Sequence, residues 1–169
     1  MSDGDPITGA VILDAIAACG IEFVVSVPDI MTTTGLLWPL VEDPRFRLIR
    51  VCKEDEGVSI CASMSICDKR ALLLIQYTGL LDSINALRAA GCQYELPVCI
   101  MTGLLEKEPG VAPAKSKNFG VRMVEPILDA MNVPHALLEV MGDVRNIRPA
   151  IDKSYVDSYP TALLIGRQI

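Results

Sequence analysis

Short apolar runs alternate along the chain with segments in which apolar residues recur at helical spacing. The apolar runs, bounded by glycine, proline or aspartate, predict strands at residues 23–27, 47–51, 71–76, 97–102, 136–139 and 161–165. The segments of helical spacing predict helices at 9–19, 32–40, 54–65, 80–90, 121–131 and 143–155. Thr8 is placed to cap the first of these helices and Asp143 the last.

The expected strands are apolar at consecutive positions, as in the run 71–75. A continuous apolar run suits a strand that is covered on both faces, which is the situation in a parallel sheet flanked by helices. A length of 169 residues suits one domain. We therefore predict an α/β fold: a single domain over residues 1–169, with a doubly wound, mostly parallel six-stranded sheet and helices on both faces. Chemistry in such folds gathers at the carboxyl ends of the strands.

One long segment, 103–120, shows neither strand nor helix spacing and contains Pro109, Gly110 and Pro113. Loops of this length are uncommon in compact domains unless they are mobile or functional. We expect a mobile loop here, after the fourth strand.

Composition narrows the classes of partner. The formal net charge of −6 argues against nucleic acid, because binding to phosphates requires a basic face. Hydrophobic residues make up 51% of the chain, yet its apolar runs are too short to cross a bilayer, so the surplus fits an interface with a partner protein. No signal region follows the acidic N-terminus, and we expect a soluble, cytoplasmic protein whose six cysteines are reduced and largely buried.

Three consecutive acids, Glu54, Asp55 and Glu56, stand where a predicted strand gives way to a helix. Taken alone they are typical of a first helical turn, which the helix dipole makes favourable for negative charge. The segment that follows, Gly57 and then Val58-Ser59-Ile60-Cys61-Ala62-Ser63, is predicted to form a helix rich in small residues.

A second notable segment, Gln76-Tyr77-Thr78-Gly79-Leu80-Leu81, follows the next buried strand. Thr78 and Gly79 suit a turn at which the following helix begins. This reading accounts for the glycine without any appeal to function.

Together the two segments resemble the pyrimidine-binding domain of thiamine-diphosphate-dependent enzymes, and most of all the alpha-subunit type of the sulfopyruvate and phosphonopyruvate decarboxylases. The resemblance covers nearly the whole chain. It implies that Glu54 is catalytic: it would hydrogen-bond N1′ of the cofactor's aminopyrimidine and so control the proton that activates the cofactor. It also implies that Thr78, Gly79 and Leu80 lie against the pyrimidine ring. Glu56 is the alternative if the register of the match is shifted.

The resemblance also implies a substrate side of the site, formed by Pro28, Asp29, Gln76 and Tyr77. By itself, an aspartate after a proline is equally a turn former or a helix cap. The chain departs from its relatives here, with Tyr77 where most have asparagine and Leu81 where most have glycine. A basic turn expected after the fourth strand is replaced by Gly103-Leu104-Leu105.

In enzymes of this kind the cofactor lies between two domains, and this chain resembles only the one that binds the pyrimidine. The resemblance therefore implies a separate diphosphate-binding, beta-type subunit that holds Mg²⁺, and a hetero-oligomer with active sites between the subunits. The partner and a 2-oxo acid substrate are expected to be necessary for activity. We identify no metal ligands in the chain itself.

Several alternatives remain open from the sequence. The same fold and cofactor could serve another 2-oxo acid or a carboligation, and the chain could be a non-catalytic α/β module that binds a partner or a small ligand. A flavodoxin-like nucleotide-binding domain would hold phosphate at a helix N-terminus, where the acids at 54–56 are electrostatically unfavourable. The single histidine, His135, has no visible catalytic partner and fits a structural role.

Overall fold

The computed structural model describes residues 2–169 and contains one sheet of six parallel strands. The strands are β1 Phe23–Ser26, β2 Arg47–Arg50, β3 Ala71–Gln76, β4 Cys99–Gly103, β5 His135–Leu138 and β6 Thr161–Ile165. Their order across the sheet is β2-β1-β3-β4-β6-β5. Every pairing is parallel, so all the carboxyl ends lie at one edge of the sheet. The chain reverses its direction across the sheet between β1 and β3, which is where such folds usually place a ligand.

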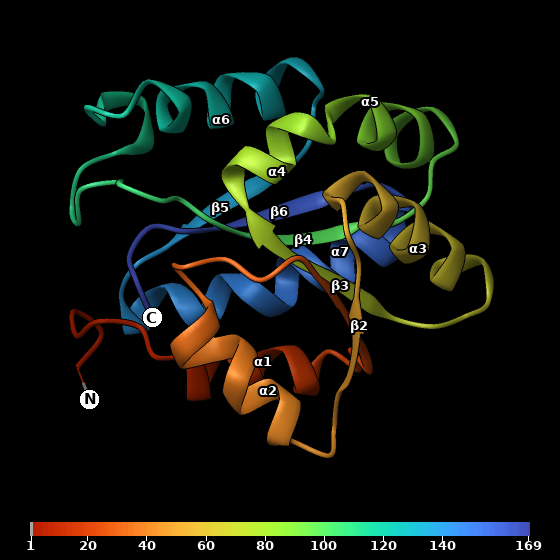
Figure 1. Ribbon diagram of the computed structural model, residues 1–169, viewed down its shortest axis with the longest axis horizontal. Coiled ribbons are helices and arrows are strands. Elements are labelled where there is room, and N and C mark those ends of the chain that lie inside the picture. Colours follow the sequence, from red (N-terminus) through yellow and green to blue (C-terminus); the bar gives the residue numbers. More distant parts are fainter. Residues whose placement is uncertain (1) are drawn as a thin grey trace.

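The helices lie in two layers, one on each face of the sheet (Figure 1). They are α1 Gly9–Ala18, α2 Trp38–Glu42, α3 Glu54–Ile66, α4 Tyr77–Asp82, α5 Ile84–Ala86, α6 Phe119–Ala130 and α7 Ile147–Asp157. One layer contains α1, α2 and α7, and the other contains α3, α4, α5 and α6. The predicted doubly wound α/β fold with helices on both faces is confirmed.

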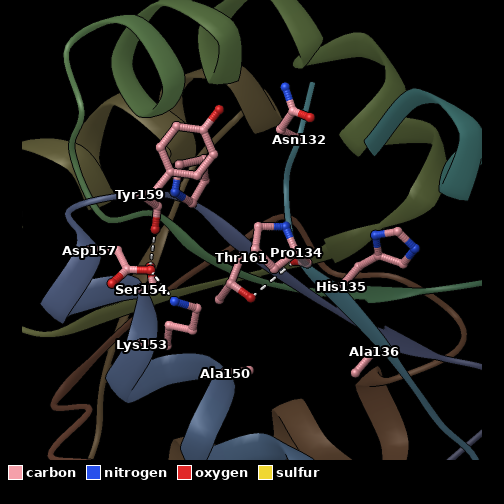
Figure 2. Close-up of a pocket in the computed structure, with 11 residues that line it drawn as sticks. Asn132, Pro134, His135, Ala136, Ala150, Lys153, Ser154, Asp157, Tyr159 and Thr161 are labelled. Atoms are coloured by element: carbon pink, nitrogen blue, oxygen red, sulfur yellow. Dashed lines mark hydrogen bonds and ion pairs between the residues drawn. The ribbon is translucent and has the colours of Figure 1, made fainter. Parts of the chain in front are cut away.

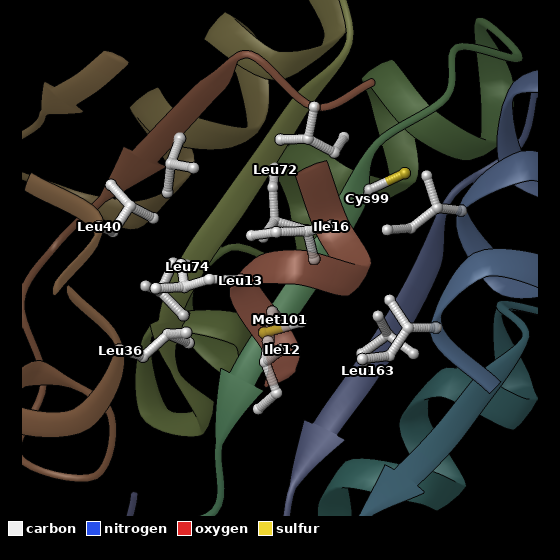
Figure 3. Packing of buried hydrophobic residues seen from close by; sticks show 14 of the residues in the cluster. Ile12, Leu13, Ile16, Leu36, Leu40, Leu72, Leu74, Cys99, Met101 and Leu163 are labelled. Carbon is white, nitrogen blue, oxygen red and sulfur yellow. The ribbon is translucent and has the colours of Figure 1, made fainter. Parts of the chain in front are cut away.

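The buried strand β3 shows why the apolar runs are continuous. Leu72 and Leu74 point into the core beneath α1, whereas Leu73 and Ile75 point into the core beneath α3 and α4. Figure 3 shows the first of these cores, in which side chains of α1 meet those of β3, β4 and β6. Because the side chains from Leu72 to Ile75 enter two different cores in alternation, a polar residue at any of these four positions would be buried at a cost in free energy unless it found a hydrogen-bond partner.

Two expected helices have a different form. Residues 33–37 are π-helical and lead into α2, in which Pro39 occupies the first turn, where a missing N–H costs nothing. The expected helix 143–155 begins instead as a 3₁₀ segment, Met141–Asn146, and continues as α7. Asp143 is the third residue of this segment and not the residue before it, but it still caps the segment, since its carboxylate accepts hydrogen bonds from the backbone N–H groups of Glu139 (2.8 Å) and Val140 (2.9 Å).

The helix expected to begin at Thr78 or Gly79 begins slightly earlier, since Tyr77, Thr78 and Gly79 together form the first turn of α4. The expected helix 80–90 is in fact α4, α5 and a π-helical segment, Leu87–Gln93. The segment 103–120 is also less irregular than its composition suggests: Pro113–Lys115 form a 3₁₀ turn and α6 begins at Phe119. No helix within residues 2–169 combines the length and apolar character needed to span a membrane.

Candidate active site

Helix α3 lies close to the sheet because of a glycine in its first turn. A Cβ atom at Gly57 would lie 2.5 Å from Leu73 Cδ1 and 3.4 Å from Val25 Cγ1. Only a residue without a side chain permits this approach to β3 and β1. The helix therefore begins directly above the carboxyl ends of these strands, and its first residue is Glu54.

Glu54 and Gly79, from the two segments singled out in the sequence, are in direct contact. A Cβ atom at Gly79 would overlap the carboxyl group of Glu54. The absence of a side chain at Gly79 is thus what leaves room for this carboxylate between α3 and α4. Glu54 is half-buried, and no hydrogen bond or ion pair ties its carboxylate to another group within residues 2–169.

The neighbouring acids are occupied by the helix itself. The Glu56 carboxylate accepts hydrogen bonds from the backbone N–H groups of Cys52 (3.1 Å) and Lys53 (3.4 Å), which completes a capping box. Asp55 accepts a hydrogen bond from the N–H of Glu56 (2.9 Å). Of the three consecutive acids, Glu54 is therefore the one whose carboxylate is left to meet a ligand.

Lys53 links the start of α3 to the end of α4. Its ammonium nitrogen lies 3.2 Å from Asp82 Oδ2 and 3.9 Å from Asp55 Oδ2. The hydrogen bond to Asp82, and then the charge of Asp55, raise the pKa of Lys53 above its ordinary value. This exposed positive charge next to Glu54 partly balances the acids of the helix start. The pairing of Lys53 with Asp82 could not be predicted from the sequence, because this pairing depends on how α3 and α4 pack against each other.

The predicted cofactor contacts after β3 point in different directions. Thr78 is exposed, and its hydroxyl donates a hydrogen bond to Gln76 Oε1 (2.8 Å). Leu80 is fully buried in the core beneath α3 and α4. Tyr77 is also buried: its hydroxyl donates to Asn118 Oδ1 (3.3 Å), and its ring lies against Gly120. Gln76 and Thr78 therefore lie nearest the surface, and Gly79 lies against Glu54. Tyr77 instead supports the start of α6.

The predicted substrate residues after β1 are one exposed proline and one buried aspartate. Pro28 is exposed, and Asp29 is 7% exposed. The Asp29 carboxylate accepts hydrogen bonds from the backbone N–H groups of Met31 (2.6 Å) and Thr32 (3.2 Å) and from the Thr32 hydroxyl. It also packs on the last residue of β4, since a Cβ at Gly103 would lie 3.1 Å from Asp29 Oδ1. In this structure Asp29 is a turn-stabilising residue, and its contact with a substrate stays a prediction.

The three lysines of the segment 103–120 fall into two groups. The side chain of Lys107 is 0% exposed, and its nitrogen lies 2.5 Å from Glu139 Oε1 in a buried ion pair. It also donates to the carbonyl of Glu108 (3.0 Å). Lys115 and Lys117 are exposed, so these two alone of the three are accessible to an anionic substrate.

Other reactive side chains have structural surroundings. His135 Nδ1 lies 3.1 Å from the carbonyl of Val133, in keeping with a structural histidine. All six cysteines are unpaired; Cys19, Cys61 and Cys99 are buried, but Cys52 and Cys67 are exposed, so the expectation of largely buried thiols holds for only part of the set. Burial raises the pKa of Cys99 to about 12, which keeps this thiol protonated. Within residues 2–169 no cluster of metal-ligating side chains occurs.

Comparison with known proteins gives three relatives with one name. Sulfopyruvate decarboxylase subunit alpha of Methanococcus maripaludis is 28% identical over 156 residues, which are 89% of this chain and 89% of that protein. The subunit of the same name from Methanocaldococcus jannaschii is 28% identical over 158 residues, 90% of this chain and 89% of that one. That of Methanothermobacter thermautotrophicus is 32% identical over 82 residues, 48% of this chain and 49% of the relative. No family model matches the chain.

Two of these relatives match this chain over almost its full length, and all three carry the same name. The chain is therefore similar over almost its whole length to sulfopyruvate decarboxylase alpha subunits.

Proposed function

We propose that this chain is the alpha subunit of a thiamine-diphosphate-dependent 2-oxo acid decarboxylase, acting on sulfopyruvate or a similar substrate such as phosphonopyruvate. The observation that carries the proposal is the half-buried carboxylate of Glu54, which lies against Gly79 and has no partner within residues 2–169. The names of the relatives support the decarboxylase and its division into subunits.

The residues around Glu54 fit the aminopyrimidine half of the cofactor. The space left by the missing side chain of Gly79 is filled by the Glu54 carboxylate, and a flat ring would lie against the exposed side of this carboxylate. An exposed hydroxyl, that of Thr78, lies one residue away. We assign the diphosphate and Mg²⁺ to a beta-type partner subunit, so that the complete site forms where the two chains meet.

In this proposal thiamine diphosphate would supply the electron sink for the loss of carbon dioxide. Glu54 holds a proton in a hydrogen bond to the N1′ nitrogen of the aminopyrimidine and thereby sets the protonation of the ring. The rigid start of α3, fixed by the Glu56 cap and by the contact at Gly57, keeps the carboxylate in place. The covering partner excludes water from the half-exposed side of Glu54.

The test is decarboxylation of sulfopyruvate, phosphonopyruvate and pyruvate by this chain mixed with its beta-type partner, thiamine diphosphate and Mg²⁺. Glu54→Gln keeps the shape of the side chain but removes its basicity, and we expect it to lower kcat by at least about 100-fold. Glu56→Gln is the matched control, because an amide oxygen can still accept the two capping hydrogen bonds. It should retain activity within about threefold of the unmodified chain.

Equal losses in the two variants, or a loss in Glu56→Gln alone, would contradict the assignment of Glu54. Activity with pyruvate and none with sulfopyruvate would keep the mechanism and change the substrate. If the reconstituted mixture released carbon dioxide from none of the three acids, the decarboxylase proposal would fail, and a non-catalytic binding module would take its place.

A further inference from the structure

A cavity of about 370 Å³ opens at the edge of the sheet opposite to Glu54. His135 and Thr161, the first residues of β5 and β6, line it, so it lies at the amino ends of these parallel strands. Its other wall is the last part of α7 (Figure 2). Its size is within the range that holds small ligands, and its position makes it independent of the proposed reaction.

The walls of this cavity are mostly apolar. Pro134, Ala136, Ala150 and Pro160 contribute carbon surfaces. The hydroxyl groups present are already used within the protein: Ser154 donates to the carbonyl of Tyr159 and Thr161 donates to that of Pro134, as the dashed lines in Figure 2 show. A ligand would therefore meet an apolar interior and would find its polar partners at the rim.

The rim has a negative electrostatic character from several sources. Two helices of more than ten residues end beside it, α6 at Ala130 and α7 at Asp157, and the C-terminal ends of helices carry partial negative charge. Asp157 itself lines the cavity. Asp129, in the last turn of α6, lies 4.0 Å from His135 Nε2 and adds a second carboxylate nearby.

One positive side chain already occupies this rim. Lys153, one turn before Asp157 on α7, forms an ion pair with its carboxylate. Both partners are substantially exposed, at 64% and 44% of their side-chain surface, and such pairs are weak. The pair follows from the spacing of four residues on one helix, and its weakness means that another cation can compete with Lys153 for Asp157.

We propose that this cavity binds a small organic cation: an ammonium group held at Asp157 by the two helix ends, attached to an apolar body that lies between Pro134, Ala150 and Pro160. An anion is disfavoured, because the C-terminal ends of α6 and α7 and the carboxylates of Asp129 and Asp157 would repel it. The ligand is thus an amphipathic amine, and its site lies apart from the proposed cofactor edge.

The test is a titration of the ¹⁵N-labelled full chain with 2-phenylethylammonium, followed by NMR. Its matched control is 3-phenylpropanoate, which has the same ring and linker but carries a carboxylate. We expect saturable shifts of backbone amides at 132–136 and 153–161 with the amine and not with the carboxylate. Equal or stronger binding of the carboxylate, shifts centred elsewhere, or no shifts at millimolar amine would overturn the proposal.

Two substitutions on α7 should then act in opposite directions. Asp157→Asn removes the anchoring charge and should weaken binding of the amine about fivefold, whereas Lys153→Met removes the competing ammonium and should strengthen binding by a similar factor. Glu42→Gln makes the same charge change as Asp157→Asn at an exposed position on α2 and should leave affinity unchanged. Effects of the same sign in both α7 variants, or an effect of Glu42→Gln as large as that of Asp157→Asn, would refute the site.

Discussion

Glu54, Asp55 and Glu56 are chemically alike and adjacent, yet the helix gives them different surroundings. A carboxylate at the third helical position can reach back to the unpaired N–H groups before the helix, and Glu56 does so. The first helical position cannot reach these groups, so Glu54 projects across to α4 instead. Helix geometry, rather than charge, thus separates the capping acid from the acid proposed to be catalytic.

The contact between Glu54 and Gly79 can be tested by a double-mutant cycle. Gly79→Ala should displace the flexible Glu54 side chain, because the added methyl group would overlap the carboxylate, and this displacement should cancel part or all of the stability that alanine gains in a helix. In a Glu54→Ala background this overlap is absent, and the same change should stabilise the chain by about 0.5–1 kcal/mol, the helix preference for alanine over glycine. The measurement is the free energy of unfolding in urea for the four proteins.

Gly4→Ala is a suitable control for this cycle, since a Cβ there would meet no atom within 4 Å. Additive effects of Gly79→Ala and Glu54→Ala would show that the two residues do not constrain each other. The close approach of α3 and α4 at this point would then need another explanation.

At the scale of elements, the segment between β4 and α6 is fastened at several points. Glu108 accepts hydrogen bonds from the Ser116 hydroxyl (2.8 Å) and the Lys117 N–H (3.1 Å), and Asn118 donates to Glu106 (2.8 Å). The hydrogen bond from Ser116, and then those from backbone N–H groups, lower the pKa of Glu108. These contacts give a defined shape to a segment expected from its composition to be mobile, and its motion stays a prediction.

The buried pair of Lys107 and Glu139 should dominate the stability of this segment. Lys107→Met removes one partner and leaves the Glu139 carboxylate in a site where it is 13% exposed, at an expected cost of about 3–5 kcal/mol. The double variant Lys107→Met/Glu139→Gln removes both charges and should recover much of that loss. Urea unfolding of the two variants and the unmodified chain provides the comparison.

Lys117→Met is the matched control, because this lysine lies on the same segment but is exposed. It should change the free energy of unfolding by no more than about 0.5 kcal/mol. A Lys107→Met variant as stable as the Lys117→Met variant would mean that the buried pair contributes little to holding the segment on β5.

At the scale of the whole molecule, the doubly wound sheet separates two edges. The carboxyl edge presents Glu54 and Gly79, whereas the amino edge presents the cavity between β5, β6 and α7. The half-exposed Glu54 carboxylate fits a site that is completed by another chain, as the names of the related alpha subunits suggest.

This proposed division of the site predicts that thiamine diphosphate binds only to the assembled enzyme. Calorimetric titration with thiamine diphosphate and Mg²⁺ should give no measurable heat of binding with this chain alone, and saturable binding after the beta-type subunit is added. Light scattering of the mixture should show a hetero-oligomer. Saturable binding or decarboxylation by the isolated chain would contradict a site shared between subunits.

The strand pattern and its two-faced burial could be read from the sequence alone. Continuous apolar runs such as 71–75 arise because both faces of a central parallel strand are covered, and this local signal was sufficient to predict the sheet and its helices. The position of Glu54 between a strand and a helix could also be predicted, because the apolar run before it and the helical spacing after it are local patterns. Chain-local features of this kind depend on neighbours within a few residues.

Only the tertiary structure decided which side chains meet. Three contacts join segments that are far apart in the chain: Glu54 with Gly79, Lys107 with Glu139, and Asp29 with Gly103. An aspartate is usually exposed, so the sequence alone left Asp29 available to a substrate. Its burial depends on the packing of distant strands and loops, which residue type and spacing alone do not encode.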